Sequence, residues 1–203
     1  MGDNLRKLYL IRHGQTIFNE TGKVQGWSDS PLSELGFRQT EAAKQFINDK
    51  NLHFDKVYSS PLSRCLTTTK LLIDQEYEEH PGLMEWNFGY YEGDENKVVF
   101  KDGRWNKLMH GEDQDYFKVK GGESYQEFVD RINLAFKEII DADHESTLAV
   151  THGAVLRIFF NTRFDESLLK GEGFYNNCIM EYNINENNEV EFVAIYNPAK
   201  GVK

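Results

Sequence analysis

Three short apolar segments constrain the fold of this 203-residue chain more than any other feature of its sequence. They are residues 7–12, 56–60 and 148–151, and each is followed by polar or glycine residues and then by a helical pattern. Short segments of this kind, bounded by turn residues, are typical of buried β-strands. Because strands that alternate with helices form sheets covered by helices, the sequence predicts an α/β fold: a three-layer sandwich with a central, mostly parallel sheet. We expect one domain over residues 1–203.

The helical patterns have recognisable starts. Ser33 is a candidate N-cap for a helix that continues to about residue 50, and Pro61 occupies the first turn expected of a second helix. Residues 124–141 carry apolar side chains at intervals of three and four, which indicates an amphipathic helix. A further helix is expected from residue 154.

Two regions depart from this alternation. Residues 178–184 and 189–196 flank Asn187-Asn188 and predict a β-hairpin. Residues at about 86–122 fit no clean period and predict an inserted cap or loop region. Five aromatic residues in this region would form either the core of the cap or a wall for an apolar part of a ligand; they are Trp86, Tyr90, Tyr91, Trp105 and Tyr116.

The charge balance limits the partners of the protein. The chain has 33 acidic and 23 basic residues, a formal net charge of −10. A protein so acidic has no overall attraction for nucleic acid or for an anionic membrane, so we expect neither as a partner. An anionic small molecule would have to be bound by a few converging arginines. Whether the protein is a monomer or a homodimer stays open.

The apolar segments and the two cysteines indicate the compartment of the protein. The apolar run at residues 8–11 is too short for a signal peptide, and no apolar segment has transmembrane length, so we expect a cytoplasmic protein. Cys65 and Cys178 are far apart and form no CxxC motif, so we expect both to be ordinary buried core residues.

The ends of the three predicted strands carry the chemistry. The first runs into Arg12-His13-Gly14, the second into Ser59-Ser60 with Arg64 shortly after, and the third into Thr151-His152-Gly153. Parallel sheets bind ligands at the carboxyl ends of their strands. If these strands are neighbours, two histidines and two arginines converge at one edge of the sheet.

These residues belong to a longer series of motifs. In chain order the motifs are Arg12-His13-Gly14-Gln15-Thr16 with Asn19, residues 24–33 (VQGWSDSPLS), residues 58–64 (YSSPLSR), residues 83–89 (LMEWNFG) with Glu92-Gly93, residues 121–124 (GGES) and residues 150–153 (VTHG). The series resembles the signature of the histidine phosphatase superfamily, also called the phosphoglycerate mutase-like family. The resemblance covers residues 7–157, about three quarters of the chain.

The resemblance implies a role for each motif. His13 would be the nucleophile that forms a phosphohistidine, and Glu85 the general acid and then base, with Glu123 as a second candidate or helper. Arg12, Arg64 and His152 complete the catalytic group. The residues expected to bind phosphate are Arg12, Asn19, Gln25, Gly26, Arg64, His152 and Gly153. The resemblance implies no metal and no other cofactor.

The chemistry explains why these residue types are needed together. A nucleophilic imidazole must be neutral, and the cations Arg12 and Arg64 favour the neutral form of His13. We expect the other ring nitrogen of His13 to donate to a backbone carbonyl, which fixes the tautomer. A protonated His152 would add a further donor to the phosphoryl oxygens. Glu85 needs a raised pKa, which the apolar neighbours in its segment could supply through desolvation.

A zinc site is the rival interpretation of the histidines. It would combine His13, His152 and Glu85, but no HxH or HExxH motif supports it. The remaining histidines lie in polar contexts and are expected at the surface; they are His53, His80, His110 and His144.

Hydrolysis and phosphoryl isomerisation are both known in this family. Its mutases use an adjacent arginine pair in the inserted segment, and this chain has no Arg-Arg pair. Between Gly93 and Gly121 six basic and six acidic residues balance, so the lid has no net positive charge. Gln25 and Ala154 also replace residues that are typical of the mutases.

The sequence therefore predicts a metal-independent phosphomonoester phosphatase, with room for broad specificity and a small-molecule phosphomonoester as its partner. The first alternative is a cofactor-dependent phosphoglycerate mutase. The second is a catalytically inactive module that binds a phosphorylated ligand or a partner.

Overall fold

A computed structural model describes residues 5–203; the first four residues of the expected domain lie outside the described part. Its centre is a six-stranded sheet in the order β3-β2-β4-β1-β5-β6. The first four strands of this order are parallel, and β5 and β6 are antiparallel to their neighbours. The mixed, mostly parallel sheet confirms the predicted fold class. The strands are β1 (Arg6–Arg12), β2 (Lys56–Ser59), β3 (Glu78–Glu79), β4 (Ser146–Thr151), β5 (Ile179–Ile184) and β6 (Val190–Tyr196).

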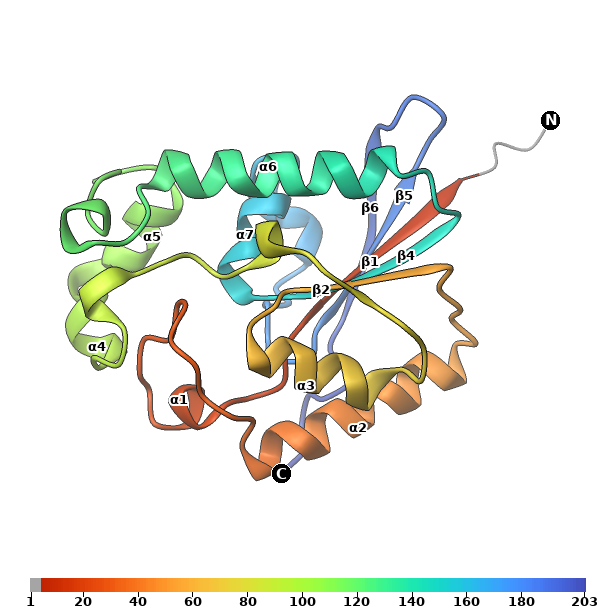
Figure 1. The fold of residues 1–203 in the computed structure, drawn as a ribbon, viewed down its shortest axis with the longest axis horizontal. Coiled ribbons are helices and arrows are strands. Elements are labelled where there is room, and N and C mark those ends of the chain that lie inside the picture. Colours follow the sequence, from red (N-terminus) through yellow and green to blue (C-terminus); the bar gives the residue numbers. More distant parts are fainter. Residues whose placement is uncertain (1–4) are drawn as a thin grey trace.

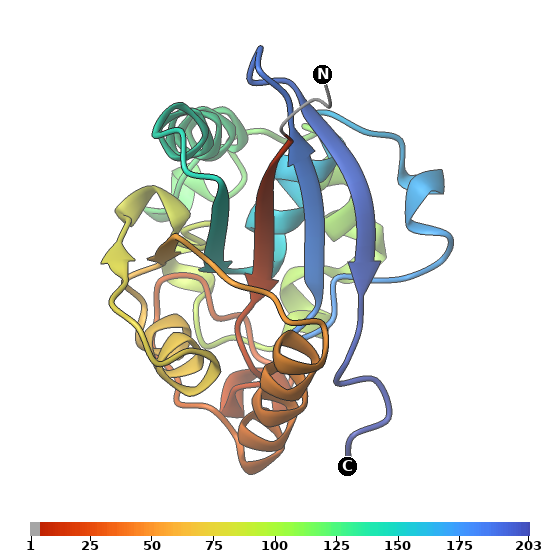
Figure 2. The same cartoon turned by 90° about the vertical axis from the view of Figure 1, so that its right-hand side faces the viewer.

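The sheet separates two hydrophobic cores. Alternate residues of β1 face opposite sides, so Leu8 and Leu10 belong to one core and Tyr9 and Ile11 to the other. The helices α6 (Tyr125–Asp141) and α7 (Gly153–Asn161) cover the first core, and α2 (Glu34–Asp49) and α3 (Ser63–Leu72) cover the second. Figure 1 shows the two helical layers on either side of the sheet, and Figure 2 shows β4, β1, β5 and β6 side by side.

Helix starts follow the sequence signals at two positions. Ser33 caps α2, and its side chain accepts a hydrogen bond from the Gly36 amide. Ser124 caps α6 in a capping box with Glu127, in which each side chain accepts a bond from the other's backbone amide. Both caps satisfy amides that the first helical turn leaves without a partner.

The prediction for α3 was wrong in detail. The helix begins at Ser63 with Leu62 as its N-cap, two residues after Pro61. Its buried face is mostly polar and consists of Arg64, Cys65, Thr68, Thr69 and Leu72. The expected start was wrong because Pro61 precedes the N-cap instead of lying in the first turn.

Other departures are short elements. The helix expected from residue 154 begins one residue earlier, with His152 as its N-cap. No sequence signal indicated the two-residue strand β3 or the helix α1 (Ile17–Glu20), which Thr16 caps. The predicted hairpin is present as β5 and β6, with Asn188 at a positive φ of 61° in the turn.

The expected insert, residues 86–122, contains α4 (Asn96–Val99), α5 (Arg104–Met109) and several single 3-10 turns. Its aromatic residues mostly belong to the core that α6 and α7 cover: Trp86 is fully buried and stacks on Phe128 of α6, with ring centres 5.0 Å apart. Tyr91 stacks on Tyr116 at 5.2 Å. Figure 1 shows α4 and α5 together at one end of the molecule. We call residues 86–122 the cap.

The four histidines outside the predicted site differ in their exposure. His53 and His110 are exposed as expected, but His80 and His144 are half-buried, and His80 lies 3.1 Å from a carboxylate oxygen of Glu138. Cys65 is buried and reduced, as is the second cysteine, Cys178. Among residues 5–203, no helix is long and apolar enough to cross a membrane.

Candidate active site

The strand register brings the predicted residues together. β1 and β4 are parallel neighbours with Arg12 opposite Thr151, so His13 and His152 leave adjacent strand ends. β2 lies on the other side of β4, and α3 places Arg64 in its first turn beside them. A cavity of about 300 Å³ opens at this edge. The predicted residues that line it are Arg12, His13, Asn19, Gln25, Gly26, Arg64, Glu85 and Gly153.

His13 is buried and held in one tautomer. Its Nδ1 lies 2.8 Å from the Gly14 carbonyl oxygen and donates to it, as expected from the sequence. The lone pair therefore resides on Nε2. Burial lowers the pKa of His13 well below its ordinary value, and the neighbouring Arg64 and Arg12 lower it further. The ring is a neutral base with one free nitrogen.

His152 differs from its expected state. Arg64 donates its Nε–H to His152 Nδ1 at 3.2 Å, and His152 Nε2 donates to Ser60 Oγ at 2.7 Å. Burial, followed by the charge of Arg64, holds its pKa well below the ordinary value. The expectation of a protonated His152 was therefore wrong for the free protein. Its ring does not line the cavity but packs edge-on against the His13 ring, with centres 5.2 Å apart.

Both arginines are anchored by carbonyl oxygens; Arg64 is buried and Arg12 is half-buried. Arg64 donates to the Gly26 oxygen at 2.6 Å and to the Ser28 oxygen at 3.2 Å. Arg12 donates to the Phe174 oxygen at 2.7 Å, while its buried Nε has no partner within the described residues. Buried N–H groups of this kind normally have an acceptor, so the site is arranged to receive one.

Gln25 has a similar unfilled donor. Its Oε1 accepts a hydrogen bond from Thr16 Oγ1 at 2.9 Å, which fixes the orientation of the amide. Its buried Nε2 has no partner in the described part of the chain. Two donors at the cavity, Arg12 Nε and Gln25 Nε2, thus lack acceptors.

Glu85 combines a raised pKa with a fixed position. Burial raises its pKa, and hydrogen bonds from the backbone amides of Trp86 and Ala154, at 3.0 and 3.3 Å, offset this in part. The carboxyl group lines the same cavity as His13. A raised pKa favours the protonated carboxyl group, the form that a general acid needs.

Glu92 joins the loop of residues 24–33 to the segment that carries Glu85. Its carboxylate accepts hydrogen bonds from the amides of Trp27, Ser28 and Phe88 at 2.7–3.1 Å, and from Ser28 Oγ. Gly26, at a φ of +57°, lies so near that a Cβ there would come within 2.2 Å of Glu92 Oε1. The sequence did not assign a role to Glu92, although Glu92-Gly93 was part of a motif.

Glu123 does not line the cavity. It forms an ion pair with Arg131 at 2.8 Å, and Arg131 donates to the Met84 oxygen at 2.8 Å and to the Glu85 oxygen at 3.0 Å. Glu123 therefore supports the backbone on either side of the acid. This geometry does not favour the proton-transfer role that the sequence left open for it.

Sequence reasoning missed several residues of the cavity. Arg157 lines it from α7, where spacings of three and four place it on one face with Gly153 and Ala154. That spacing would have identified Arg157. Lys23 and Phe174 also line the cavity, and no sequence signal indicated Phe174 in its loop before β5.

The rival zinc site finds no support in this geometry. Both ring nitrogens of His152 are engaged, one by Arg64 and one by Ser60. Among residues 5–203 no group of three or more His, Cys, Asp or Glu side chains is arranged to hold a metal ion.

A neutral histidine at a strand end, beside half-buried Arg12 and buried Arg64, forms an arrangement that suits an anionic ligand. The family model for the histidine phosphatase superfamily (branch 1) matches residues 8–195. The chain belongs to this superfamily.

Two relatives with different names match this chain at similar sequence identity. The chain is 31% identical over 169 residues to "Putative phosphoserine phosphatase 2" of Hydrogenobacter thermophilus, which covers 75% of each chain. It is 30% identical over 161 residues to "Probable phosphoglycerate mutase GpmB" of Yersinia pestis, covering 77% of this chain and 74% of the other.

A solved structure extends the likeness to three dimensions. The phosphoserine phosphatase of Entamoeba histolytica, in complex with 3-phosphoglyceric acid, superposes with a TM-score of 0.75 at 27% identity. The match covers 94% of this chain and 96% of that chain.

Proposed function

We propose that the protein is a metal-independent phosphomonoester phosphatase that acts through a phosphohistidine at His13. One observation carries the proposal: His13 is neutral, with Nδ1 bound to the Gly14 oxygen and Nε2 free, beside Arg12 and the buried Arg64. This is the state that an imidazole nucleophile needs before it attacks phosphorus.

In the first step the Nε2 lone pair of His13 forms the N–P bond while the bond from phosphorus to the ester oxygen breaks. Glu85, protonated at the start, gives its proton to the leaving oxygen, and the alcohol departs. The Gly14 oxygen stabilises the positive charge that develops on the ring, because it accepts the Nδ1–H bond.

In the second step a water attacks the phosphorus of the phosphohistidine. The Glu85 carboxylate takes a proton from this water, the P–N bond breaks, and inorganic phosphate leaves. His13 is neutral again and Glu85 is again protonated, so the cycle closes with the hydrolysis of one ester bond.

The remaining polar groups would hold the phosphoryl oxygens. Arg12 and Arg64 offer planar pairs of N–H groups that match phosphate geometry, and the unpartnered Arg12 Nε and Gln25 Nε2 supply further donors. Asn19 Oδ1 accepts from the Thr16 amide and from Asn176, which leaves its Nδ2 for the ligand. These groups make metal assistance unnecessary in the proposed reaction.

In this mechanism His152 is a positioning residue. It is fixed between Arg64 and Ser60, so it orients the Arg64 guanidinium and packs against the ring of the nucleophile.

The composition of the cap supports hydrolysis over isomerisation as the proposed reaction. The six basic residues between Gly93 and Gly121 are matched by six acidic ones, and the chain has no Arg-Arg pair. Relatives of this chain carry both kinds of name, a phosphoserine phosphatase and a phosphoglycerate mutase, so the assay must separate the two reactions.

The test is phosphate release from a panel of phosphomonoesters with a chelator present. The panel contains an aryl phosphate, 3-phosphoglycerate, 2,3-bisphosphoglycerate and sugar phosphates, and the His13→Ala variant serves as the control. We expect chelator-insensitive release that the variant loses by at least about 10⁴-fold. Conversion of 3- to 2-phosphoglycerate without net release would establish a mutase instead. Binding without turnover of any substrate would establish an inactive module.

A further inference from the structure

A short segment just before β5 holds the end of β1 from the side opposite β4. The Arg12 backbone amide donates to the Cys178 oxygen at 3.2 Å, and the Arg12 oxygen accepts from the Asn177 amide at 3.1 Å. The Arg12 side chain donates to the Phe174 oxygen at 2.7 Å. Asn177 has a positive φ of 58°, a conformation that asparagine adopts more readily than most residues. The segment thus turns tightly beside β1, and we call residues 174–178 the strap.

The side chain of Asn176 reaches from the strap to the loop that follows β1. Its Nδ2 donates to the His13 carbonyl oxygen at 3.0 Å and to Asn19 Oδ1 at 3.3 Å. Asn176 lines a separate cavity of about 310 Å³ and not the cavity that His13 lines. It can therefore act on a bound substrate only through the groups that it contacts.

These contacts fix the orientation of two carboxamide groups in series. A carbonyl oxygen only accepts hydrogen bonds, so the His13 oxygen requires the nitrogen of the Asn176 amide on its side. Asn19 Oδ1 then faces two donors, Asn176 Nδ2 and the Thr16 amide, at 3.3 Å each. Asn19 also lines the active-site cavity. Since its oxygen is engaged by these two donors, its Nδ2 is the atom that remains to meet a phosphoryl oxygen.

The balance between the two orientations of the Asn19 amide determines how much these contacts matter. A neutral hydrogen bond favours the orientation that makes it by about 2- to 12-fold, so two such bonds favour it by about 5- to 150-fold. A flipped amide would lose both bonds and place its nitrogen against two donors. Nearly every molecule therefore presents the nitrogen, and the affinity for a ligand falls in proportion to the fraction that does not.

We propose that Asn176 is a positioning residue that keeps Asn19 as a hydrogen-bond donor toward the phosphoryl group. The inference rests on the proposed phosphatase function, and it gives a role to a residue that lies beyond all the sequence motifs of the site. The oxygens of a phosphoryl dianion only accept hydrogen bonds, so a flipped Asn19 would oppose them with its own oxygen. The strap thus determines the polarity of one side of the phosphate site.

Two substitutions of Asn176 that differ in polarity test the proposal, with calorimetry of inorganic phosphate as the measurement. Asn176→Asp has nearly the same shape, but its carboxylate only accepts and so attracts the Asn19 nitrogen. We expect the affinity for phosphate to fall by about 5- to 50-fold. Asn176→Leu leaves the Thr16 amide to orient Asn19, so its loss should stay within about threefold. The kcat/KM for p-nitrophenyl phosphate should follow the same order.

A double-mutant cycle separates this role from a purely structural one. If Asn176 acts through Asn19, the effect of Asn176→Asp should shrink by at least about fivefold once Asn19→Ala has removed the amide. A structural role, such as support of the His13 oxygen, would lower the affinity equally in both backgrounds. Repulsion between the new carboxylate and phosphate is present in both backgrounds, so it cancels from the comparison.

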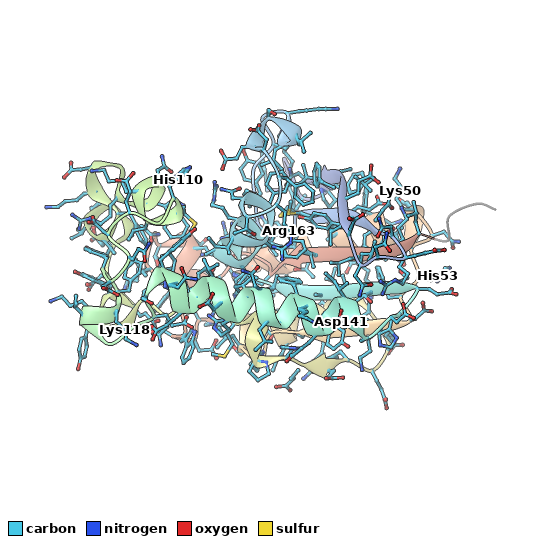
Figure 3. The ribbon with its side chains drawn as sticks, turned by 90° about the horizontal axis from the view of Figure 1, so that it is seen from above. Lys50, His53, His110, Lys118, Asp141 and Arg163 are labelled. Atoms are coloured by element: carbon cyan, nitrogen blue, oxygen red, sulfur yellow. The ribbon has the colours of Figure 1, made fainter. Side chains whose placement is uncertain are left out.

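Arg163→Gln is the control for net charge, because it changes the charge of the protein by the same amount and sign as Asn176→Asp. Arg163 lies outside the active-site cavity, with its guanidinium over the Phe159 ring. Figure 3 shows Arg163 on the face of the molecule that carries α6. The control should bind phosphate as tightly as the unchanged protein.

A further variant keeps the test valid if Asn176→Asp does not fold. In Asn19→Asp the new carboxylate meets the same two donors, Asn176 Nδ2 and the Thr16 amide. This variant should therefore keep the Tm of the unchanged protein, while it binds phosphate more weakly than Asn19→Ala does. A lowered Tm would show that position 19 does not face two donors.

Three results would overturn the role of Asn176 while leaving the phosphatase function intact. They are equal phosphate affinities of Asn176→Asp and Asn176→Leu, an undiminished effect in the Asn19→Ala background, and a lowered Tm of Asn19→Asp. The affinities need no turnover, so they test Asn176 even where no ester is hydrolysed and the proposed function fails. An unchanged protein that neither binds phosphate nor hydrolyses an ester would contradict both proposals.

Discussion

The inner and outer parts of the cavity are built in different ways. The inner part joins the ends of β1 and β4 to the first turn of α3, and hydrogen bonds hold His13, Arg64 and His152 there in buried positions. The outer part is lined by Phe100 and Trp105 of the cap, by Lys23 and Phe174 from two loops, and by Arg157 from α7. Its charged groups are partly exposed.

This difference separates the reaction from the choice of substrate. The inner groups His13, Arg64 and Glu85 can act on any phosphomonoester, because they meet only the phosphoryl group and the leaving oxygen. The outer groups can differ without disturbing the sheet, since short cap elements and loops hold them. Variants should therefore divide into those that affect all substrates and those that affect one class.

The largest effect after loss of the nucleophile is expected for Glu85→Gln. The amide cannot transfer a proton, so kcat for alkyl phosphates should fall by about 10²- to 10⁴-fold. With p-nitrophenyl phosphate the leaving group needs no proton, so the first step should stay fast and the second become limiting. Stopped-flow measurement should then record a burst of p-nitrophenolate. A variant with equal losses on alkyl and aryl esters, and no burst, would contradict the role of Glu85.

A smaller loss, shared by all substrates, is expected for Glu92→Ala. It removes the acceptor of four hydrogen bonds that join the Gly26 loop to the Glu85 segment. Since hydrogen bonds to a charged group contribute about 1.5–3 kcal/mol each, we expect a lower Tm and a roughly 10- to 100-fold lower kcat/KM for every ester.

The matched control for this prediction is Glu112→Ala, an exposed carboxylate of the cap. Its activity and Tm should equal those of the unchanged protein. If Glu92→Ala impaired one class of substrate only, Glu92 would belong to the outer part of the cavity and the division between the two parts would be wrong.

The buried aromatic residues of the cap should affect the stability of the protein more than the rate of the reaction. Phe117 is fully buried against Phe88 and Trp86, so Phe117→Ala should reduce the free energy of unfolding by about 3–5 kcal/mol. Its KM should rise several-fold while kcat for p-nitrophenyl phosphate changes little. Tyr90→Ala, at a side chain that is 85% exposed, is the control. Chemical denaturation measures the stability of both variants, and steady-state kinetics measures their kcat and KM. A kcat that fell together with stability would show that the cap determines the geometry of the inner part directly.

The smallest predicted effect is a dependence of stability on pH. His13 and His152 have folded-state pKa values well below 6.5, so below this pH the unfolded chain binds more protons than the folded protein does. Stability should therefore fall as the pH decreases below about 6.5. Glu85, with its raised pKa, acts in the opposite sense, because its contribution is lost as the pH rises through that pKa.

Thermal unfolding across this pH range measures the dependence, and His152→Asn should make the decline shallower. An unchanged slope in this variant would mean that His152 is not the neutral, buried group described above.

Sequence reasoning reached the inner part of the cavity because its residues lie within contiguous motifs at strand ends. Arg12 and His13 follow one strand and His152 follows another, so the rule that ligands bind at carboxyl ends was enough to bring them together. The same reasoning failed for the protonation of His152, which depends on a contact with Arg64 that no spacing reveals.

The outer part was less predictable for a physical reason. Lys23 and Phe174 reach the cavity through loop and cap packing between segments far apart in the chain. The start of α3 was misplaced because it was assigned from Pro61, a residue favoured in the first turn of helices, whereas Pro61 here precedes the Leu62 N-cap. Only Arg157 had a usable signal, its spacing from Gly153 along one helix face.

The central claim is that His13 Nε2 becomes phosphorylated during turnover. The most direct measurement is rapid quenching of the enzyme with substrate in alkali, followed by mass spectrometry of its peptides. The account predicts one added phosphoryl group on the peptide with His13, stable in alkali, lost in acid and missing in His13→Ala. A phosphoryl group on another residue, or undiminished turnover by His13→Ala, would contradict it.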